Sequence, residues 1–356
     1  MGRTVLSLPA PSGPLAIGSV SLHLVDRSRL DPFAPAPPHR SLMVTLWYPA
    51  RPTRGAPDPY LDRGVARIAD RELEVPAGTF EAARSHARAG AALLRANRPY
   101  PVVLYSPGFG SWRNASTALV EQLVSNGFIV VTIDHPFDAA AVEFPNGSIV
   151  EGRALSVLSG SNVLTYEAWQ TMVDPFLRVR VADVGFVLDA LERLDAGHDP
   201  DANRRPLPSG LAGALDLDRV GMFGHSLGGA TTAQIMRVDR RIRAGLSLDG
   251  PIPEAHGKTP CVERPFVLIR SQDPAIERLT VPSWASPAAG LCGRRSVIVL
   301  KGAGHNDFTD LAVFARDLAI DPRQRAAWAL GSIGAAAAVN AERRSIVCFF
   351  DRWLRN

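Results

Sequence analysis

The segment from Gly224 to Gly228 has the sequence Gly-His-Ser-Leu-Gly, and its surroundings constrain the fold more than any other part of the chain. The run Arg219 to Phe223 before it is typical of the end of a buried strand, and Ala230 to Met236 after it is typical of a helix. Flanking glycines allow a sharp strand-to-helix turn that exposes the serine hydroxyl at the carboxyl edge of a sheet. The segment predicts a nucleophile elbow with Ser226 as the nucleophile. The alternative is a glycine-rich turn with an idle serine.

Short apolar runs predict the strands of a sheet. They are Ile17 to Val25, Leu42 to Tyr48, Val102 to Tyr105, Phe128 to Ile133, Val220 to Phe223, Ala244 to Leu248, Phe266 to Arg270 and Val297 to Leu300. The later six runs are continuously apolar, so we expect them to be buried on both faces of a parallel sheet that helices cover. The first two precede any crossover helix and suit an antiparallel hairpin. The predicted fold class is therefore α/β, with a mostly parallel sheet of about eight strands.

Helices are expected between these strands. Apolar positions at helical spacing predict helices at Ser116 to Ser125 and at Phe176 to Leu194. An alanine-rich stretch predicts another from about Phe80 to Leu94. The chain closes with a long alanine-rich helix from about Pro322, interrupted near Gly331.

Two stretches fall outside the alternation of strands and helices. Residues 51–98 and 137–174 are long excursions, and such excursions in a compact domain are usually functional or disordered. We expect both to be lid or cap insertions over the carboxyl edge of the sheet. No internal repeat is present, and residues 1–356 are predicted to form a single domain.

The hydroxyl of Ser226 is a weak nucleophile at neutral pH, so it needs a histidine base that a carboxylate orients. In this type of fold the acid and the histidine follow the serine along the chain. Two histidines, His256 and His305, do so. His305 lies in a glycine-rich segment directly after the last strand, where a loop can place its imidazole over the elbow, and it is the predicted base. His256 lies in a polar segment between strands, and His225 is expected to pack or hydrogen-bond elsewhere.

The acid has two candidates, Asp249 and Asp273, because each follows a predicted strand. Asp249 ends the strand immediately after the elbow helix and is preferred. Asp273 precedes Pro274 and is also typical of an Asx turn. Asp307 lies only two residues from the histidine, which is the wrong geometry to hold its ring.

A tetrahedral intermediate needs two backbone N–H groups aimed at its oxyanion. One comes from the residue after the nucleophile and the other from the loop after the third strand. These positions are Leu227 and Phe109. Gly108 and Gly110 give that loop the freedom to present the Phe109 amide.

At these residues the chain resembles the platelet-activating-factor acetylhydrolase-like branch of the α/β-hydrolases, which includes bacterial and secreted members. The resemblance covers most of the chain and rests on Gly13-Pro14 with Ile17-Gly18, Trp47-Tyr48-Pro49, Ser106 to Gly110, Ser125 to Val130, Gly224 to Ala230, Leu248-Asp249, and Gly304-His305 with Phe308. It implies an α/β-hydrolase fold with lid insertions. Its catalytic serine, aspartate and histidine correspond to Ser226, Asp249 and His305, and its oxyanion amides to Phe109 and Leu227.

Members of this family hydrolyse short or oxidised acyl esters, some on phospholipids and others on polyesters or small esters. They use no metal and no organic cofactor, so the resemblance implies none here. The chain departs from the family at Pro107, where relatives often carry histidine, and this bears on the rigidity of the oxyanion loop. The presumed lids show no matching segment, so phospholipid binding does not transfer.

The residues therefore favour a serine hydrolase that cleaves a carboxylic ester through an acyl-enzyme on Ser226. An acyltransferase or cyclase would use the same acyl-enzyme but pass the acyl group to an alcohol or amine. A non-catalytic binding protein on this scaffold would require an idle triad. Trp112, Phe137 and Trp169 are predicted to line the acyl pocket of a small-molecule or lipid ester.

The net charge is +4, and the basic residues are dispersed and often lie beside acidic ones. Without a basic block we expect no nucleic-acid partner. No apolar stretch approaches the length of a membrane span, and the first residues lack the core of an export signal. The expectation is a cytoplasmic protein, although a mature secreted chain would also lack its signal.

Three cysteines occur without a CxxC pair or a Cys/His cluster, so a metal site is not expected. Cys261 and Cys292 each lie five residues before an apolar run, Phe266 and Val297 respectively, and could meet at one edge of the sheet. A disulfide there would argue against a reducing compartment. Cys348 lies in an apolar helical stretch and is expected to be a buried thiol.

Overall fold

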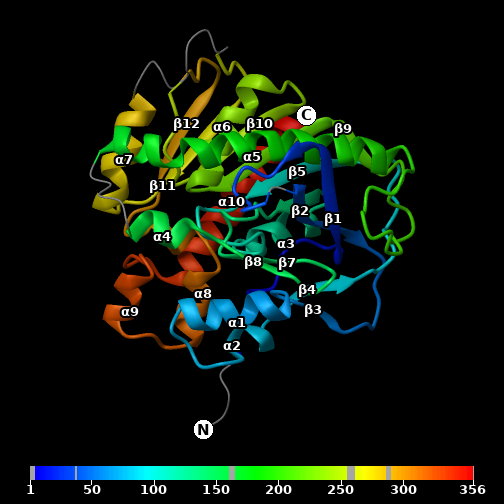
Figure 1. The fold of residues 1–356 in the computed structure, drawn as a ribbon, viewed down its shortest axis with the longest axis horizontal. Helices are drawn as coiled ribbons and strands as arrows, with labels where there is room; N and C mark the ends of the chain where they lie inside the picture. Colours follow the sequence, from blue (N-terminus) through cyan, green and yellow to red (C-terminus); the bar gives the residue numbers. More distant parts are fainter. Residues whose placement is uncertain (1–4, 37, 160–164, 255–260, 286–289, 356) are drawn as a thin grey trace.

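A computed structural model of the chain describes residues 5–36, 38–159, 165–254, 261–285 and 290–355. Its main feature is a ten-stranded sheet with the order β12-β11-β10-β9-β5-β6-β2-β1-β4-β3 (Figure 1). These strands are β1 (Ala16–Leu30), β2 (His39–Ala50), β3 (Pro57–Pro59), β4 (Arg84–Ala89), β5 (Tyr100–Ser106), β6 (Ile129–Ile133), β9 (Leu215–His225), β10 (Ile242–Leu248), β11 (Phe266–Arg270) and β12 (Arg295–Val299). A separate hairpin pairs β7 (Ala141–Glu143) with β8 (Ile149–Glu151).

Helices cover both faces of this sheet. They are α1 (Arg63–Glu72), α2 (Thr79–Ala82), α3 (Thr117–Ser125), α4 (Ala154–Ser159), α5 (Tyr166–Asp195), α6 (Leu227–Val238), α7 (Pro274–Ala285), α8 (Leu311–Asp317), α9 (Pro322–Ala327) and α10 (Ala335–Leu354). In Figure 1, α5 crosses in front of the sheet and α10 lies behind it. Helices α5 and α6 share one apolar core with the sheet, and α3 and α10 share the other.

The mostly parallel sheet is confirmed. Strands β6, β5, β9, β10, β11 and β12 pair in parallel, while β1 pairs antiparallel with β2, and β2 with β6. The antiparallel hairpin at the start is therefore also confirmed. The prediction that the later six strands are all buried on both faces is wrong for β12. This strand forms the edge of the sheet, and Val297 is 51% exposed.

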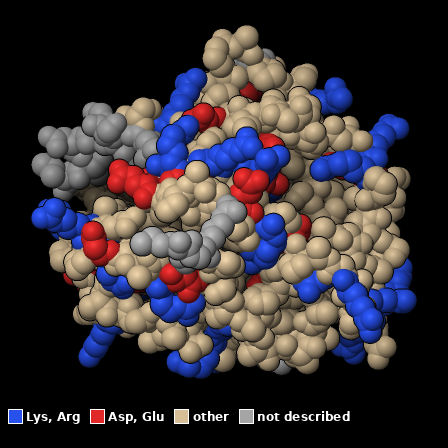
Figure 2. Space-filling view, turned by 90° about the horizontal axis from the view of Figure 1, so that it is seen from below, with Lys and Arg blue, Asp and Glu red and all other residues tan. Residues whose placement is uncertain are grey.

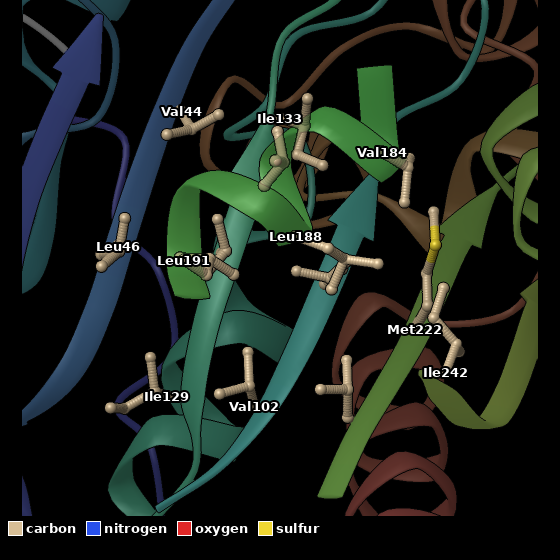
Figure 3. Packing of buried hydrophobic residues seen from close by; sticks show 14 of the residues in the cluster. Val44, Leu46, Val102, Ile129, Ile133, Val184, Leu188, Leu191, Met222 and Ile242 are labelled. Carbon is tan, nitrogen blue, oxygen red and sulfur yellow. The ribbon is translucent and has the colours of Figure 1, made fainter. Parts of the chain in front are cut away.

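The core beneath α5 accounts for the apolar side chains on one face of the central strands. Val184, Leu188 and Leu191 of α5 face the sheet, where they lie over residues such as Val102 and Met222 (Figure 3). All five are at most 2% exposed. Burying one aliphatic side chain of this size contributes about 1.5–3 kcal/mol, so this layer holds α5 firmly against the sheet.

The prediction of a helix from Phe80 to Leu94 is wrong. Within this range the short helix α2 ends at Ala82 and strand β4 follows, pairing with β1 and β3. In β4, Ser85 and Ala87 are buried while Arg84 and His86 point outward. This alternation has the period of a strand, and it outweighs the helix propensity of the alanines because it buries side chains such as Ala87 in the core on one face of the sheet.

Helix α5 begins ten residues before its predicted start at Phe176. Proline lacks the N–H that a helix interior uses for its hydrogen bonds, so a helix seldom continues through one. The helix nevertheless continues through Pro175, and Thr165 caps its start by accepting a hydrogen bond from the Ala168 amide. The interruption predicted near Gly331 is present, since α9 ends at Ala327 and α10 begins at Ala335.

Acidic and basic side chains alternate on the face that carries α1 and α8. Figure 2 shows both signs next to each other on this face. Arg71 pairs with Glu151 at 2.9 Å and Arg63 with Glu81 at 3.0 Å, all on exposed side chains. Such exposed pairs contribute at most about 1 kcal/mol each. Among the described residues, no helix combines the length and apolar character that crossing a membrane requires.

A disulfide joins Cys261 to Cys292, with the two Cα atoms 5.9 Å apart. The cysteines precede the parallel strands β11 and β12, and the bridge between Val262 and Leu291 extends the pairing of these strands toward them. The prediction that Cys348 is a buried thiol is wrong. It is exposed on α10, because it lies off the face that Ile346 and Phe350 bury against the sheet.

Replacing both Cys261 and Cys292 with serine should lower the free energy of unfolding. The cross-link spans a sequence separation of 31 residues, for which the chain-entropy model gives a loss of about 4 kcal/mol. Urea unfolding without reductant measures the difference. Cys348→Ser is the matched control, because this thiol is exposed and unbonded. An unfolding free energy that stays the same in the double variant would contradict the prediction.

Candidate active site

Ser226 lies at the turn between β9 and α6 in a strained backbone conformation, with φ 53° and ψ −119°. The turn is possible because helix and strand approach closely at two glycines. A Cβ on Gly224 would collide with the backbone of Gly228, and a Cβ on Gly228 would collide with the carbonyl of Ser106. The Ser226 amide donates to the Leu248 carbonyl at 2.8 Å, which ties the turn to β10. This geometry is that of a nucleophile elbow.

Ser226, His305 and Asp249 form one hydrogen-bonded chain. The Ser226 hydroxyl lies 3.0 Å from Nε2 of His305, and Nδ1 of His305 lies 2.8 Å from Oδ2 of Asp249. A carboxylate only accepts, so Nδ1–H donates to Asp249, and Nε2 is free to accept the serine proton. The Asp249 side chain is 1% exposed and that of His305 is 16% exposed. The arrangement can therefore generate a serine nucleophile.

Asp249 is held in place by a second residue. It follows β10 with a positive φ of 54°, and its Oδ1 and Oδ2 accept hydrogen bonds from the amide and the hydroxyl of Ser271 at 2.7 and 2.8 Å. The alternative acid, Asp273, lies at the start of α7, where it accepts from the Ala275 amide at 2.9 Å. The structure therefore brings Asp249, and not Asp273, to the histidine. The alternative base, His256, lies outside the described residues.

The segment that carries His305 is fixed on both sides. Oδ2 of Asp307 accepts from the amides of Gly304 and Gly331, each at 2.7 Å. His225 donates through Nε2 to the His305 carbonyl at 2.9 Å. Burial lowers the pKa of His225 well below its usual value, and the neighbouring His305 adds to the effect, so His225 is a neutral donor. Asp307 thus positions the loop, and its carboxylate bonds to backbone amides and not to the His305 ring.

The two residues predicted to supply oxyanion donors, Leu227 and Phe109, lie at the same cavity as Ser226. Leu227 is the first residue of α6, so its N–H has no carbonyl within the helix to which it could donate. Phe109 lies in the loop after β5, and its amide donates to no described group. Both amides are therefore available as the two donors that were predicted for a developing oxyanion.

This cavity has a volume of about 520 Å³ and an aromatic and aliphatic wall. Tyr60, Trp112, Trp169, Met172 and Leu279 line it. Two charged side chains lie on its wall, Glu72 from α1 and Arg278 from α7. Burial raises the pKa of the Glu72 carboxyl. A larger cavity of about 720 Å³ along α5 and α6 contains none of the three residues of the hydrogen-bonded chain.

The structure places Trp112 and Trp169 on the wall of this cavity, but it does not place Phe137 there. Phe137 lies in a tight turn with φ 67°, and the guanidinium of Arg153 lies 5.4 Å from the centre of its ring. The turn directs the ring toward a separate hollow that also contains Phe144. The prediction of Phe137 as a pocket residue is therefore wrong.

Sequence reasoning did not identify Ser271, the partner of Asp249, or Arg180, which contacts the oxyanion loop. Ser271 directly follows β11, so its position at the carboxyl end of the strand beside β10 was an available signal. Arg180 was assigned only to the helix over 176–194, and no local pattern marks it.

Residues 37–354 match the family described as platelet-activating factor acetylhydrolase, isoform II. The chain is similar to a probable 1-alkyl-2-acetylglycerophosphocholine esterase of Arthroderma benhamiae, with 31% identity over 68% of this chain and 58% of the relative. It is also similar to the platelet-activating factor acetylhydrolase of Cavia porcellus, with 30% identity over 61% of this chain and 50% of the relative. The chain thus spans only about half the length of the curated relatives it matches.

Among solved structures, a ferulic acid esterase from Streptomyces cinnamoneus is 32% identical, covers 98% of this chain and 93% of its own, and has a TM-score of 0.77. A dienelactone hydrolase-like phosphotriesterase from metagenomic libraries is 15% identical with a TM-score of 0.52, which supports the fold alone. The chain has the α/β-hydrolase fold, and it belongs to the platelet-activating factor acetylhydrolase isoform II family of carboxylic ester hydrolases.

Proposed function

We propose that this chain hydrolyses carboxylic esters through an acyl-enzyme on Ser226. The observation that carries the proposal is the continuous hydrogen-bonded chain from Ser226 through His305 to Asp249, at the wall of a cavity that Phe109 and Leu227 also line. The similarity to esterases supports the same reaction.

In the proposed mechanism, Nε2 of His305 accepts the hydroxyl proton as Oγ of Ser226 attacks the ester carbonyl carbon. The carbonyl oxygen becomes an oxyanion that accepts hydrogen bonds from the Phe109 and Leu227 amides. The C–O bond to the alcohol then breaks, and His305 returns the proton to the leaving alkoxide. Water attacks the acyl-enzyme by the same steps and releases the acid, while Asp249 stabilises each imidazolium.

The cavity supports a small apolar acyl group as the substrate class. Aromatic and aliphatic side chains form most of its wall, and its volume of about 520 Å³ suits a small ligand. The named relatives are esterases of a 1-alkyl-2-acetylglycerophosphocholine and of ferulic acid, so one acts on an acetyl ester and the other on an aromatic acid ester. We propose short-acyl or aromatic-acyl esters as the first substrates to test.

We further propose that residues 51–98 and 137–174 cap this site within a single domain, with the first stretch also adding β3 and β4 to the edge of the main sheet. Both stretches contribute to the cavity wall, the first through Tyr60 and Glu72 and the second through Trp169. The disulfide between Cys261 and Cys292 favours an oxidising compartment, which replaces cytoplasm as our proposed location.

Ser226→Ala should lose labelling by a fluorophosphonate and lower kcat toward short p-nitrophenyl esters by about 10⁶-fold, because the nucleophile is removed. Active-site titration and steady-state kinetics measure both effects. Ser296→Ala, at an exposed position of β12, is the control and should label like the unmodified protein. Product analysis with added alcohol or amine separates hydrolysis from acyl transfer. An unmodified protein that neither labels nor turns over would favour a binding protein.

Asp249→Asn should lower kcat by about 10⁴-fold, because the amide that replaces the carboxylate favours the wrong tautomer of His305. Asp273→Asn should leave kcat unchanged, since Asp273 contacts the start of α7 and not the histidine. Kinetics of the two variants with one ester distinguish the acids. A larger loss in Asp273→Asn would reverse the assignment.

A further inference from the structure

One buried side chain of α5, Arg180, contacts the residues that lead to Phe109. The Arg180 guanidinium donates to the Pro107 carbonyl at 2.5 Å, to the Gly108 carbonyl at 3.1 Å and to the Ser106 hydroxyl at 3.1 Å. Arg180 is fully buried, with a relative exposure of 0%. Three consecutive residues directly before Phe109 are therefore tied to one planar cation.

The contact with the Gly108 carbonyl determines the direction of the Phe109 amide. Both groups belong to the same planar peptide unit, and in a trans peptide the C=O and N–H point in opposite directions. The described chain contains no cis peptide bonds. Because Arg180 holds the Gly108 carbonyl on one side, the Phe109 N–H points away from Arg180. A hydrogen bond from a cation to this carbonyl also polarises the peptide and strengthens its N–H as a donor.

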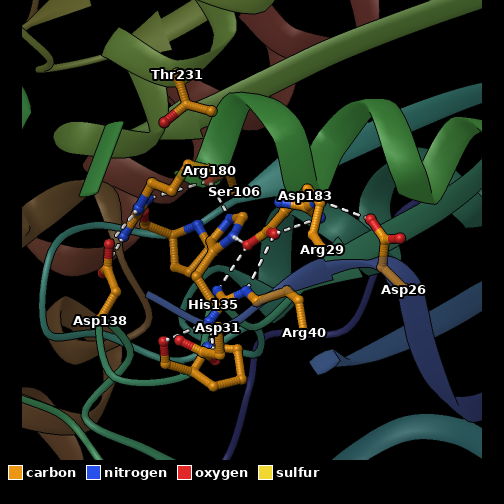
Figure 4. A network of polar contacts seen from close by, with 12 residues as sticks. Asp26, Arg29, Asp31, Arg40, Ser106, His135, Asp138, Arg180, Asp183 and Thr231 are labelled. Carbon is orange, nitrogen blue, oxygen red and sulfur yellow. Dashed lines mark hydrogen bonds and ion pairs between the residues drawn. The ribbon is translucent and has the colours of Figure 1, made fainter. Parts of the chain in front are cut away.

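Arg180 is itself rigidly placed. Asp138 receives two of its hydrogen bonds, from Nε at 2.7 Å and from Nη2 at 2.5 Å, in a bidentate pair (Figure 4). The Asp138 carbonyl also accepts the Gly110 amide at 3.1 Å, so the same residue holds the far side of the loop. Arginine suits this position because its flat fork can serve a carboxylate and two carbonyls at once, which an ammonium cannot do in a fixed geometry.

A second chain of contacts fixes the base of the loop. Ser106 lies 3.1 Å from Nε2 of His135, whose Nδ1 lies 2.9 Å from Asp183 (Figure 4). Burial lowers the pKa of His135, so the ring is neutral, donates to Asp183 and accepts from the Ser106 hydroxyl. That hydroxyl thus keeps a lone pair for Arg180.

We propose that Arg180 is a positioning residue that orients the Phe109 amide of the oxyanion hole. The proposal rests on the proposed function, since an oxyanion forms only if Ser226 attacks a carbonyl. Pro107 has no N–H to anchor the loop, and Arg180 anchors it through the carbonyls instead.

The test compares Arg180→Lys with the unmodified protein on a matched pair of substrates, an ester and its thionoester. In the thionoester, sulfur carries the developing charge and accepts hydrogen bonds poorly, so it gains little from the oxyanion donors. In Arg180→Lys the Phe109 amide should no longer point at the oxyanion. The kcat for the ester should then fall by about 10²-fold, which is the usual effect of losing one oxyanion donor, while KM stays nearly unchanged. The kcat/KM ratio of ester to thionoester should fall at least tenfold.

Arg343→Gln is the matched control. Arg343 is also buried and also donates to backbone carbonyls, those of Ala118, Ala10 and Pro9, but it lies away from the cavity. It should lose stability while keeping the ester-to-thionoester ratio. If Arg180→Lys does not fold, Asp138→Asn, which loosens the guanidinium with a side chain of the same size, should lower the ratio in the same direction.

The outcomes separate the two proposals. A ratio that falls in the Arg180 and Asp138 variants but not in Arg343→Gln supports the positioning role. A ratio that stays the same while activity falls in all three variants assigns Arg180 to general stability and overturns the inference, although the esterase proposal stands. Turnover that survives in Ser226→Ala would overturn the esterase proposal itself.

Discussion

The register between three parallel strands is the constraint on which the site depends. In the sheet, Ser106 of β5 lies opposite Gly224 of β9, and His225 lies opposite Leu248 of β10. The loop with Phe109, the turn with Ser226 and the loop with Asp249 each follow within a few residues of these positions. A shift of one residue in any of these strands would turn its side chains to the other face and separate these groups. The continuous apolar cores on both faces are what prevent such a shift.

Buried charges form the second constraint, because an unpaired charge in the interior costs several kcal/mol. Burial by itself would raise the pKa of Asp183, but Arg40 and the hydrogen bond from His135 outweigh burial and hold it below its usual value. Arg40 in turn pairs with Asp31 at 2.7 Å. The partners come from β2, α5 and the loops after β1 and β6, so the cluster requires these segments to assemble together. This cluster of buried charges supports the loop after β5 only when all four segments are in place.

Local sequence carried enough information for the parts of the fold that depend on neighbours in the chain. The turn at Ser226 depends on glycines within a few residues, and the parallel pairing of the later strands follows from apolar runs separated by helices. The three residues singled out as nucleophile, base and acid lie in one hydrogen-bonded chain. In contrast, β4 was mistaken for a helix, because its alanines have helix propensity while its pairing partner β1 lies about 70 residues away. Arg180 was missed because its partners also lie far away in the sequence: its contacts join α5 to the loop after β5.

The contacts of Arg180 connect these two constraints. The strand register places the peptide between Gly108 and Phe109 beside the elbow, but a loop next to a glycine can rotate this peptide at little cost. A buried guanidinium opposes that rotation, because turning the Gly108 carbonyl away would leave a donor without a partner in the interior, at a cost of about 1–3 kcal/mol or more. Desolvation makes the Arg180 charge costly to bury. For the same reason it makes any rotation of the peptide costly, so the direction of the Phe109 amide is well defined. In this fold, the stability of a buried ion pair and the geometry of the proposed oxyanion hole depend on the same side chain.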